Sequence, residues 1–179
     1  QGFSDPKEVQ KIELMMNSLD ISSANRPVVA AALERAEETE GPAVAIELND
    51  GRIITGKTSS LLGASSACLL NALKELAGID NELLLISPSI IQPIQKLKVE
   101  HMGNHNPRLH TDELLIALSI CAVNNPTAGA ALEQLNNLRG CEAHSTVILS
   151  NVDTDLFKKL GMNITFEPKY QAKKLFHKS

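Results

Sequence analysis

Aromatic side chains are scarce in this chain of 179 residues, and tryptophan is absent. Phenylalanine and tyrosine together make up 3% of the residues, and all four phenylalanines lie near the two ends of the chain. The core must therefore be built from Leu, Ile, Val and Ala. Proteins that read RNA or single-stranded DNA stack bases on aromatic rings, so this composition argues against that class of protein.

Positive charge is not in excess either. The chain carries 17 Lys and Arg against 21 Asp and Glu, which gives a net charge of -4 and a pI near 5.7. Binding to nucleic acid or to an anionic membrane needs a basic surface, and a solvated terminus explains the single basic cluster, KYQAKKLFHKS. We therefore expect neither nucleic acid nor a membrane as a partner.

Cysteines are few, and long apolar runs are missing. Cys68, Cys121 and Cys141 are odd in number and lack paired spacing, which indicates free thiols in a reducing compartment. No apolar run approaches the roughly 18 residues that cross a bilayer, and the N-terminal stretch does not resemble a signal peptide. These features predict a cytoplasmic protein. Because the first residue is not Met, we also expect a piece of something longer.

The residues that are present predict a single α/β core, since 43% of them are apolar and 21% are charged. Two amphipathic helices are expected first, over residues 4–19 and from Pro27 to Gly41, with Pro and Gly where helices begin and end. We accordingly assign residues 1–41 to an N-terminal helical segment and residues 42–179 to an α/β domain.

The stretch GRIITGKT, residues 51–58, matches the phosphate-loop pattern G-x-x-x-x-G-K-[ST]. The preceding Asn-Asp-Gly, however, favours a hairpin turn that ends at Gly51. Two β-branched Ile residues then favour a strand over 52–55. A Walker-type site also needs a carboxylate after a neighbouring strand, and the candidate ELLLIS ends in Ser87 instead. We favour the hairpin and keep nucleotide binding at a phosphate loop as the weaker alternative.

The hairpin places Lys57, Thr58 and Ser59 at the start of the next predicted helix, over residues 58–78. A helix N-terminus beside a lysine attracts anions, so these three residues are candidate ligand-binding residues. The small residues over 63–67 would let a ligand or another backbone approach this helix closely.

The remaining pattern predicts alternating strands and helices and, with the hairpin, a three-layer mixed sheet of about five strands. Two further helices are inserted after the second core helix. The expected strands cover 42–48, 52–57, 81–87, 141–150 and 162–168, and the expected helices cover 58–78, 88–103, 112–123, 125–140 and 153–161.

This element order resembles the cytidine-deaminase-like architecture, a resemblance that bears on fold and not on function. Zinc deaminases of that architecture carry H-x-E or C-x-E at the first core helix and P-C-x-x-C at the second. Here the two positions read LLGASSA and SPSIIQ, with Ser89 where the cysteine would stand. We therefore expect no zinc and no metal site.

Two groups of residues could still carry chemistry. His101, His105 and His110 precede Asp112 and Glu113 and could bind a metal, although acidic residues in the first turn of a helix are better explained by the helix dipole. Of this group we keep His110 as a candidate ligand-binding residue.

The second group is Cys141, Glu142 and His144. On a strand Glu142 and His144 share one face while Cys141 takes the other, which disfavours a Cys-His nucleophile. His144 is the best candidate for an acid-base residue, with a structural strand histidine as the alternative. Ser87 and Ser89 complete the candidate ligand-binding residues, because such sheets bind ligands at the C-terminal ends of their strands.

Three stretches, AIELNDGRIITGKTSSLLGASSACLLNALKELAGI, NPRLHTDELLIALSI and RGCEAHSTVILS, together resemble the C-terminal part of the bacterial domain-of-unknown-function family 1846. The resemblance covers essentially the whole chain. It implies the C-terminal third of a larger protein, whose N-terminal part would be its partner, and it brings no activity or cofactor. Two functions stay open: binding of a small anionic or phosphorylated metabolite, and a non-catalytic structural or oligomerisation module.

Overall fold

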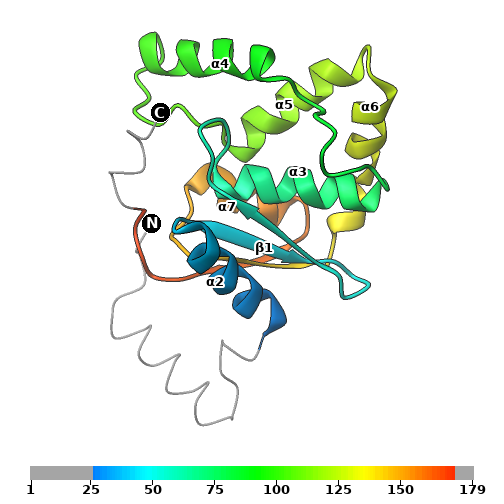
Figure 1. The fold of residues 1–179 in the computed structure, drawn as a ribbon, viewed down its shortest axis with the longest axis vertical. Helices are drawn as coiled ribbons and strands as arrows, with labels where there is room; N and C mark the ends of the chain where they lie inside the picture. Colours follow the sequence, from blue (N-terminus) through cyan, green and yellow to red (C-terminus); the bar gives the residue numbers. More distant parts are fainter. Residues whose placement is uncertain (1–25, 172–179) are drawn as a thin grey trace.

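The computed structural model of this protein describes residues 26–171 as an α/β fold around one mixed sheet (Figure 1). The sheet has four strands in the order β2-β1-β3-β4. Strand β1 runs antiparallel to both of its neighbours, whereas β3 and β4 are parallel. The strands are β1 (Ala43–Glu47), β2 (Ile53–Lys57), β3 (Glu142–Ser145) and β4 (Asn163–Phe166).

Helices cover both faces of the sheet, which confirms the three layers. Side chains alternate along β1, so Ala45 meets Val28 and Val29 of the first helix, while Val44 and Ile46 face the larger core on the other side. The predicted helix over 4–19 lies outside the described residues. The helices are α2 (Pro27–Thr39), α3 (Ala64–Leu76), α4 (Pro88–Glu100), α5 (Thr111–Ala122), α6 (Pro126–Leu132), the 3₁₀ helix η2 (Glu133–Leu138) and α7 (Asn151–Lys159).

The predicted hairpin is confirmed. Strands β1 and β2 pair from Ala43 opposite Lys57 to Glu47 opposite Ile53. The turn between them ends at Gly51, which has a φ of 89°, a conformation that glycine adopts without strain. The stretch that matches the phosphate-loop pattern is therefore a paired strand and not a loop that encloses a phosphate.

The second glycine of that pattern has a packing role. A Cβ atom on Gly56 would lie 2.2 Å from the backbone nitrogen of Cys68 in α3, which no side chain could tolerate. Gly56 therefore lets α3 lie directly on β2. The sulfhydryl group of the buried Cys68 donates to the carbonyl of Ile54 at 3.4 Å, and all three cysteines are free thiols, as expected.

The strand expected over 81–87 is wrong, so the described sheet has four strands rather than about five. The side chain of Asp80 accepts from the amide of Glu82, and the carbonyl of Asp80 accepts from the amide of Leu83. This turn leaves Leu83 and Leu84 exposed. A short apolar run does not by itself distinguish a strand from a buried loop. The cytidine-deaminase-like order stays a prediction.

The start of α3 is also corrected, because the helix begins at Ala64 and not at Thr58. The hydroxyl of Ser59 accepts from the amides of Leu61 and Leu62. This local turn competes with the helix. Lys57, Thr58 and Ser59 consequently lie before a loop or within it, and not at a helix N-terminus.

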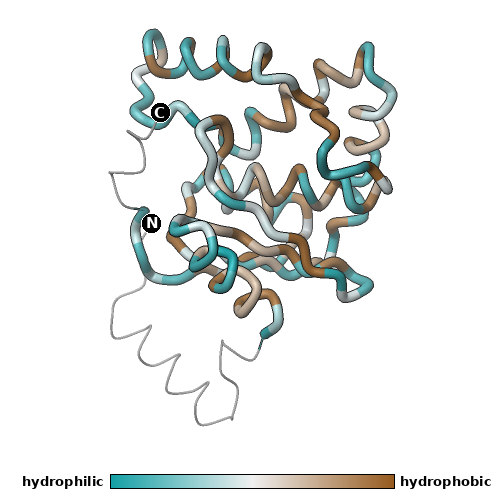
Figure 2. Tube along the Cα trace, viewed as in Figure 1, coloured by the Kyte–Doolittle hydropathy of each residue, from teal (hydrophilic) through white to brown (hydrophobic). Residues whose placement is uncertain are grey.

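The larger core lies between the sheet and the helices α3, α5 and α7. Figure 2 shows hydrophobic segments along the sheet and along α3. Leu69 and Leu73 from α3, Leu114 and Leu118 from α5 and Phe157 from α7 are all fully buried. Since each aliphatic or aromatic side chain of this size stabilises by roughly 1.5–3 kcal/mol when buried, this packing holds the three helices rigidly against the sheet.

Candidate functional site

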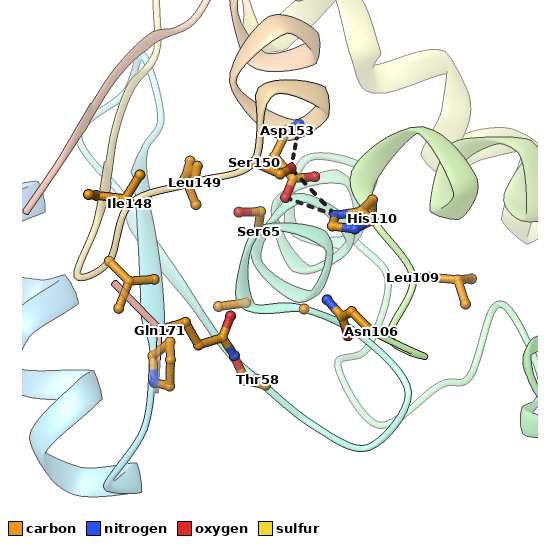
Figure 3. Close-up of a pocket in the computed structure, with 14 residues that line it drawn as sticks. Thr58, Ser65, Asn106, Leu109, His110, Ile148, Leu149, Ser150, Asp153 and Gln171 are labelled. Carbon is orange, nitrogen blue, oxygen red and sulfur yellow. Dashed lines mark hydrogen bonds and ion pairs between the residues drawn. The ribbon is translucent and has the colours of Figure 1, made fainter. Parts of the chain in front are cut away.

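The starts of α3, α5 and α7 meet at one end of the sheet, where β2 and β3 end and β1 begins. A cavity of about 170 Å³ lies between them (Figure 3). Among the described residues no Phe, Tyr or Trp side chain lines it. The polar side chains that line it include those of Thr58, Ser65, Asn106, His110, Ser150 and Asp153.

The first turn of α5 is capped by a carboxylate from α7. The amide and the hydroxyl of Thr111 both donate to Oδ1 of Asp153, at 2.9 and 2.8 Å. The amide of Asp153 in turn donates to the hydroxyl of Ser150, the N-cap residue of α7, at 3.2 Å. These bonds satisfy donors that a helix leaves free at its start, so α5 and α7 stabilise each other.

The same carboxylate contacts an imidazole. Nδ1 of His110 lies 3.4 Å from Oδ2 of Asp153. Hydrogen bonding to Asp153 raises the pKa of His110 above its ordinary value, although burial opposes the shift. Burial would raise the pKa of Asp153, but the hydrogen bonds from His110 and Thr111 outweigh it and hold that pKa below its ordinary value. The two side chains therefore favour the charged pair.

These residues do not form a hydrolytic triad. The hydroxyl of Ser150 lies 3.5 Å from Nδ1 of His110, the same nitrogen that faces Asp153. In a Ser-His-Asp triad the serine and the aspartate contact opposite ring nitrogens. The pair His110–Asp153 thus supplies an acid-base group without an activated serine.

A second buried ion pair holds the segment before α5. Nζ of Lys98 lies 2.7 Å from Oε2 of Glu113 and also donates to the carbonyl of Arg108 at 2.7 Å. The carboxylate of Glu113 accepts from the amide of His110 at 2.8 Å. Lys98 is almost fully buried, and a buried ammonium is stable only when it is paired and hydrogen-bonded. The backbone of His110 is thereby fixed relative to α4.

The start of α3 has no comparable cap. Gly63 occupies the N-cap position and has no side chain to offer. Within residues 26–171 the amides of Ala64 and Ser65 form no hydrogen bond, and neither does the hydroxyl of Ser65, although that residue is only 3% exposed. Both residues line the cavity, and Ser65 is labelled in Figure 3. This helix start is therefore open toward the cavity.

The structure brings two of the predicted ligand-binding residues together. Thr58 and His110 line the same cavity. Lys57 is exposed and does not line it, and the hydroxyl of Ser59 belongs to its local turn. Ser87 and Ser89 lie at the start of α4 with their hydroxyl oxygens 2.6 Å apart, also outside this cavity.

His144 lies elsewhere, on the face of the sheet that α2 covers. Its ring is buried, with Nδ1 2.8 Å from the hydroxyl of Thr165 and Nε2 3.0 Å from Glu167. Burial lowers its pKa. Glu142, which shares this face of the strand, pairs with Arg26 at 2.6 Å. The structure does not join His144 to Lys57 in one pocket, and its surroundings are those of a structural histidine.

The remaining histidines of the predicted cluster are separate from the cavity. His101 and His105 are exposed. Across residues 26–171 no group of three or more His, Cys, Asp or Glu side chains could hold a metal ion. His110 is thus the histidine of that cluster that enters the cavity, and its carboxylate partner comes from a helix more than 40 positions later.

Sequence reasoning missed Ser65 and the pair Ser150 and Asp153 as residues of this cavity. Ser150 and Asp153 stand three positions apart, which is the spacing of an N-cap and an acidic residue in the first turn, so this signal could have located the start of α7. Ser65 carries no such signal, because its importance depends on a cavity between distant segments.

Comparison with known proteins identifies the family. The family model described as the domain of unknown function DUF1846, C-terminal, matches residues 24–176. The chain is 54% identical to a UPF0371 protein of Streptococcus thermophilus over 95% of its length, and 56% identical to a UPF0371 protein of Corynebacterium glutamicum over 94%.

In both comparisons this chain covers 34% of the length of the relative. It therefore spans about a third of the length of the curated relatives it matches. Among the described residues no helix is long and apolar enough to cross a membrane. The match over residues 24–176 and the identity to these bacterial proteins show that the chain belongs to the family of DUF1846 C-terminal domains.

Proposed function

We propose that this domain binds a small metabolite through an anionic group, a phosphate or a carboxylate, at the open start of α3. The observation that carries the proposal is the environment of Ser65 at this helix start. This residue is 3% exposed and lines the cavity, and its hydroxyl lacks a hydrogen-bond partner within residues 26–171. Because this hydroxyl is not fully enclosed by protein atoms, it is open to the cavity, where a ligand oxygen would take the place of water as its partner.

The backbone supports the same ligand chemistry. The free amides of Ala64 and Ser65 point along the axis of a helix of 13 residues, and the dipole of such a helix gives its start a partial positive charge. Helix starts of this kind bind phosphates and carboxylates through their amides. We therefore propose anion binding at the first turn of α3 and not beside Lys57.

The size of the cavity indicates that other parts of the protein complete the pocket. Its volume of about 170 Å³ is below the ~300–1,000 Å³ of typical small-molecule sites. Since the relatives are about three times as long as this chain, we propose that their N-terminal part or a second subunit supplies the remaining wall. We also propose that the protein is cytoplasmic and that its partner is neither nucleic acid nor a membrane.

A structural or oligomerisation module is the second candidate, favoured by an apolar surface on α5. Ile116, Ile120 and Val123 are 60%, 62% and 78% exposed, and Leu84 beside Ile120 is 69% exposed. Adjoining apolar side chains of this size commonly mark a contact surface. Replacing Ile120 by Lys should then weaken assembly in analytical ultracentrifugation and leave anion binding unchanged.

The anion site is tested by titrating sulfate and inorganic phosphate into the protein at its natural length by calorimetry. Gly63→Asp would place a carboxylate at the N-cap position, where a Cβ has room 3.7 Å from the carbonyl of Leu109. This side chain would occupy the free amides, so anion binding should be lost while the fold is retained. Gly63→Ala, which adds no acceptor, should still bind.

Ser65→Ala should weaken binding about tenfold, as expected for one hydrogen bond to a charged ligand. Ser89→Ala is the matched control, because Ser89 occupies the same second position of α4 outside the cavity. Unchanged binding in Gly63→Asp, or no binding of either anion to the unmodified protein, would refute the anion site.

A further inference from the structure

Two ionisable side chains line the cavity, and their charges are coupled. Within residues 26–171, His110 and Asp153 are the only His, Lys, Arg, Asp or Glu residues that line it. Both oxygens of Asp153 are engaged, Oδ1 by Thr111 and Oδ2 by His110. The pair is neutral when the imidazole is protonated, and it carries one negative charge when the imidazole is neutral.

The other charged groups near His110 act on its pKa in opposite directions, since Lys98 lowers it and Glu113 raises it. Lys98 of α4 and Glu113 of α5 lie close to it, and they pair with each other at 2.7 Å. Protonation of His110 therefore decides whether an anion in the cavity meets a neutral pair or the unbalanced carboxylate of Asp153.

We infer that His110 is the cationic contact of the site, and that its ligand is a doubly charged oxyanion of the phosphate-monoester class that binds together with a proton on His110. This inference rests on the anion site at α3. Nδ1 of His110 faces Asp153 at 3.4 Å, while Nε2 forms no hydrogen bond within residues 26–171. The side chain is 28% exposed and lines the cavity.

The arrangement of donors supports the ligand class. The donors around this small cavity come from two helix starts, and Figure 3 shows the side chains of Ser65 and His110. They are the amides of Ala64 and Ser65, the hydroxyl of Ser65 and the free nitrogen of His110. Three groups of donors match the three terminal oxygens of a phosphate monoester. A carboxylate offers only two oxygens in one plane, which match donors from two separate helix starts less well.

The residues around the anion site suit a small polar remainder. Asn106 and Thr58 line the cavity with a carboxamide and a hydroxyl. Among the described residues no Phe, Tyr or Trp lines it, so the large rings that most often stack on a nucleobase are missing there. The expected ligand is a phosphorylated hydroxy compound and not a nucleotide base.

Proton coupling is measured with sulfate, which stays a dianion over the working range, so any proton taken up must come to the protein. Calorimetric titrations in buffers of different ionisation enthalpy, at a pH above the pKa of His110 that NMR measures without sulfate, should show proton uptake on binding. Affinity should fall about tenfold for each pH unit once His110 is deprotonated, as required for one linked proton.

His110→Asn keeps a donor toward Asp153 and removes the titration, so uptake and the pH slope should both disappear. His101→Asn, at an exposed histidine, is the matched control and should change neither. In the unmodified protein the ring signals of His110 in NMR should report a higher pKa with sulfate than without it, which tests the inference without any variant.

The outcomes separate the two proposals. Sulfate binding without proton uptake, or uptake that persists in His110→Asn, overturns the role of His110 and leaves the anion site at α3 standing. Absence of sulfate binding at pH 5.5, where His110 is protonated, overturns the anion site itself. Equal affinity for acetate and sulfate contradicts the ligand class.

Discussion

Helices α3 and α5 start side by side, but their N-termini are capped differently. The amide of Gly63 donates to the carbonyl of Leu109, and Leu62 and Leu109 form an isolated parallel bridge, so the two starts are joined. At the start of α5 the amide and the hydroxyl of Thr111 both donate hydrogen bonds to Asp153. At α3 the corresponding amides and the hydroxyl of Ser65 are free within the described residues.

This difference separates a helix start that contributes to stability from the one at which we propose that a ligand binds. A buried, capped helix start strengthens the core, while an open one beside a cavity is a binding surface for anions. Nothing in the space around Gly63 prevents a capping side chain there. The open start of α3 is therefore compatible with selection for binding and is not required by packing.

The largest expected effect comes from removing the cap of α5. Asp153→Ala would leave the buried amide and hydroxyl of Thr111 without partners and His110 without its counter-charge. We expect a loss of about 2–4 kcal/mol in the free energy of unfolding, measured by urea denaturation. Asp155→Ala, an exposed aspartate of the same helix, should change stability by less than about 0.5 kcal/mol. Equal losses in the two variants would contradict the capping role.

The second prediction compares one hydroxyl from each helix start. Thr111→Val removes a buried hydroxyl that donates to Asp153 and should cost about 1–2 kcal/mol of stability. Ser65→Ala removes a hydroxyl without a partner within residues 26–171, so stability should change by less than about 0.5 kcal/mol. The order should reverse for sulfate affinity, with Ser65→Ala the more damaging. A larger stability loss for Ser65→Ala would show that its hydroxyl has a structural partner.

The smallest expected effect is the pH dependence of stability from His110. Because Asp153 raises the pKa of His110 in the folded state, protonation of His110 stabilises the fold. This contribution is complete below the pKa of an unfolded histidine, about 6.5, and is lost as pH rises through the folded pKa. The urea midpoints of the unmodified protein and of His110→Asn should therefore converge between pH 5.5 and 8.5. A gap that widens with pH would mean that His110 is stabilised in its neutral form.

Several elements followed from local patterns alone. Asn-Asp-Gly before two β-branched residues predicted the hairpin, and the confirmed turn has Gly51 at positive φ. Pro27 and Pro88 marked the starts of α2 and α4. Pro93 does not end α4, and the helix expected over 125–140 divides into α6 and η2. These signals act over a few residues, so a sequence reading can use them.

Local patterns predicted only part of the candidate site. Thr58 and His110 were named from their places after a strand and before a helix, and both line the cavity. Ser65 and Asp153 were missed because their role requires α3 and α7 to be brought to the same place. His144 looked chemically available on its strand, but Thr165 and Glu167 from β4 and beyond engage both ring nitrogens.

The sequence by itself determined the α/β class, the hairpin, the free thiols and the family, because these depend on composition, on short-range turn and capping chemistry, and on extended identity with relatives. Tertiary structure alone decided which helix start is capped and which is open. That outcome depends on one carboxylate reaching 42 positions back along the chain to Thr111, and hydrogen-bond partners at such separations are set by the packing of the core and not by any local pattern.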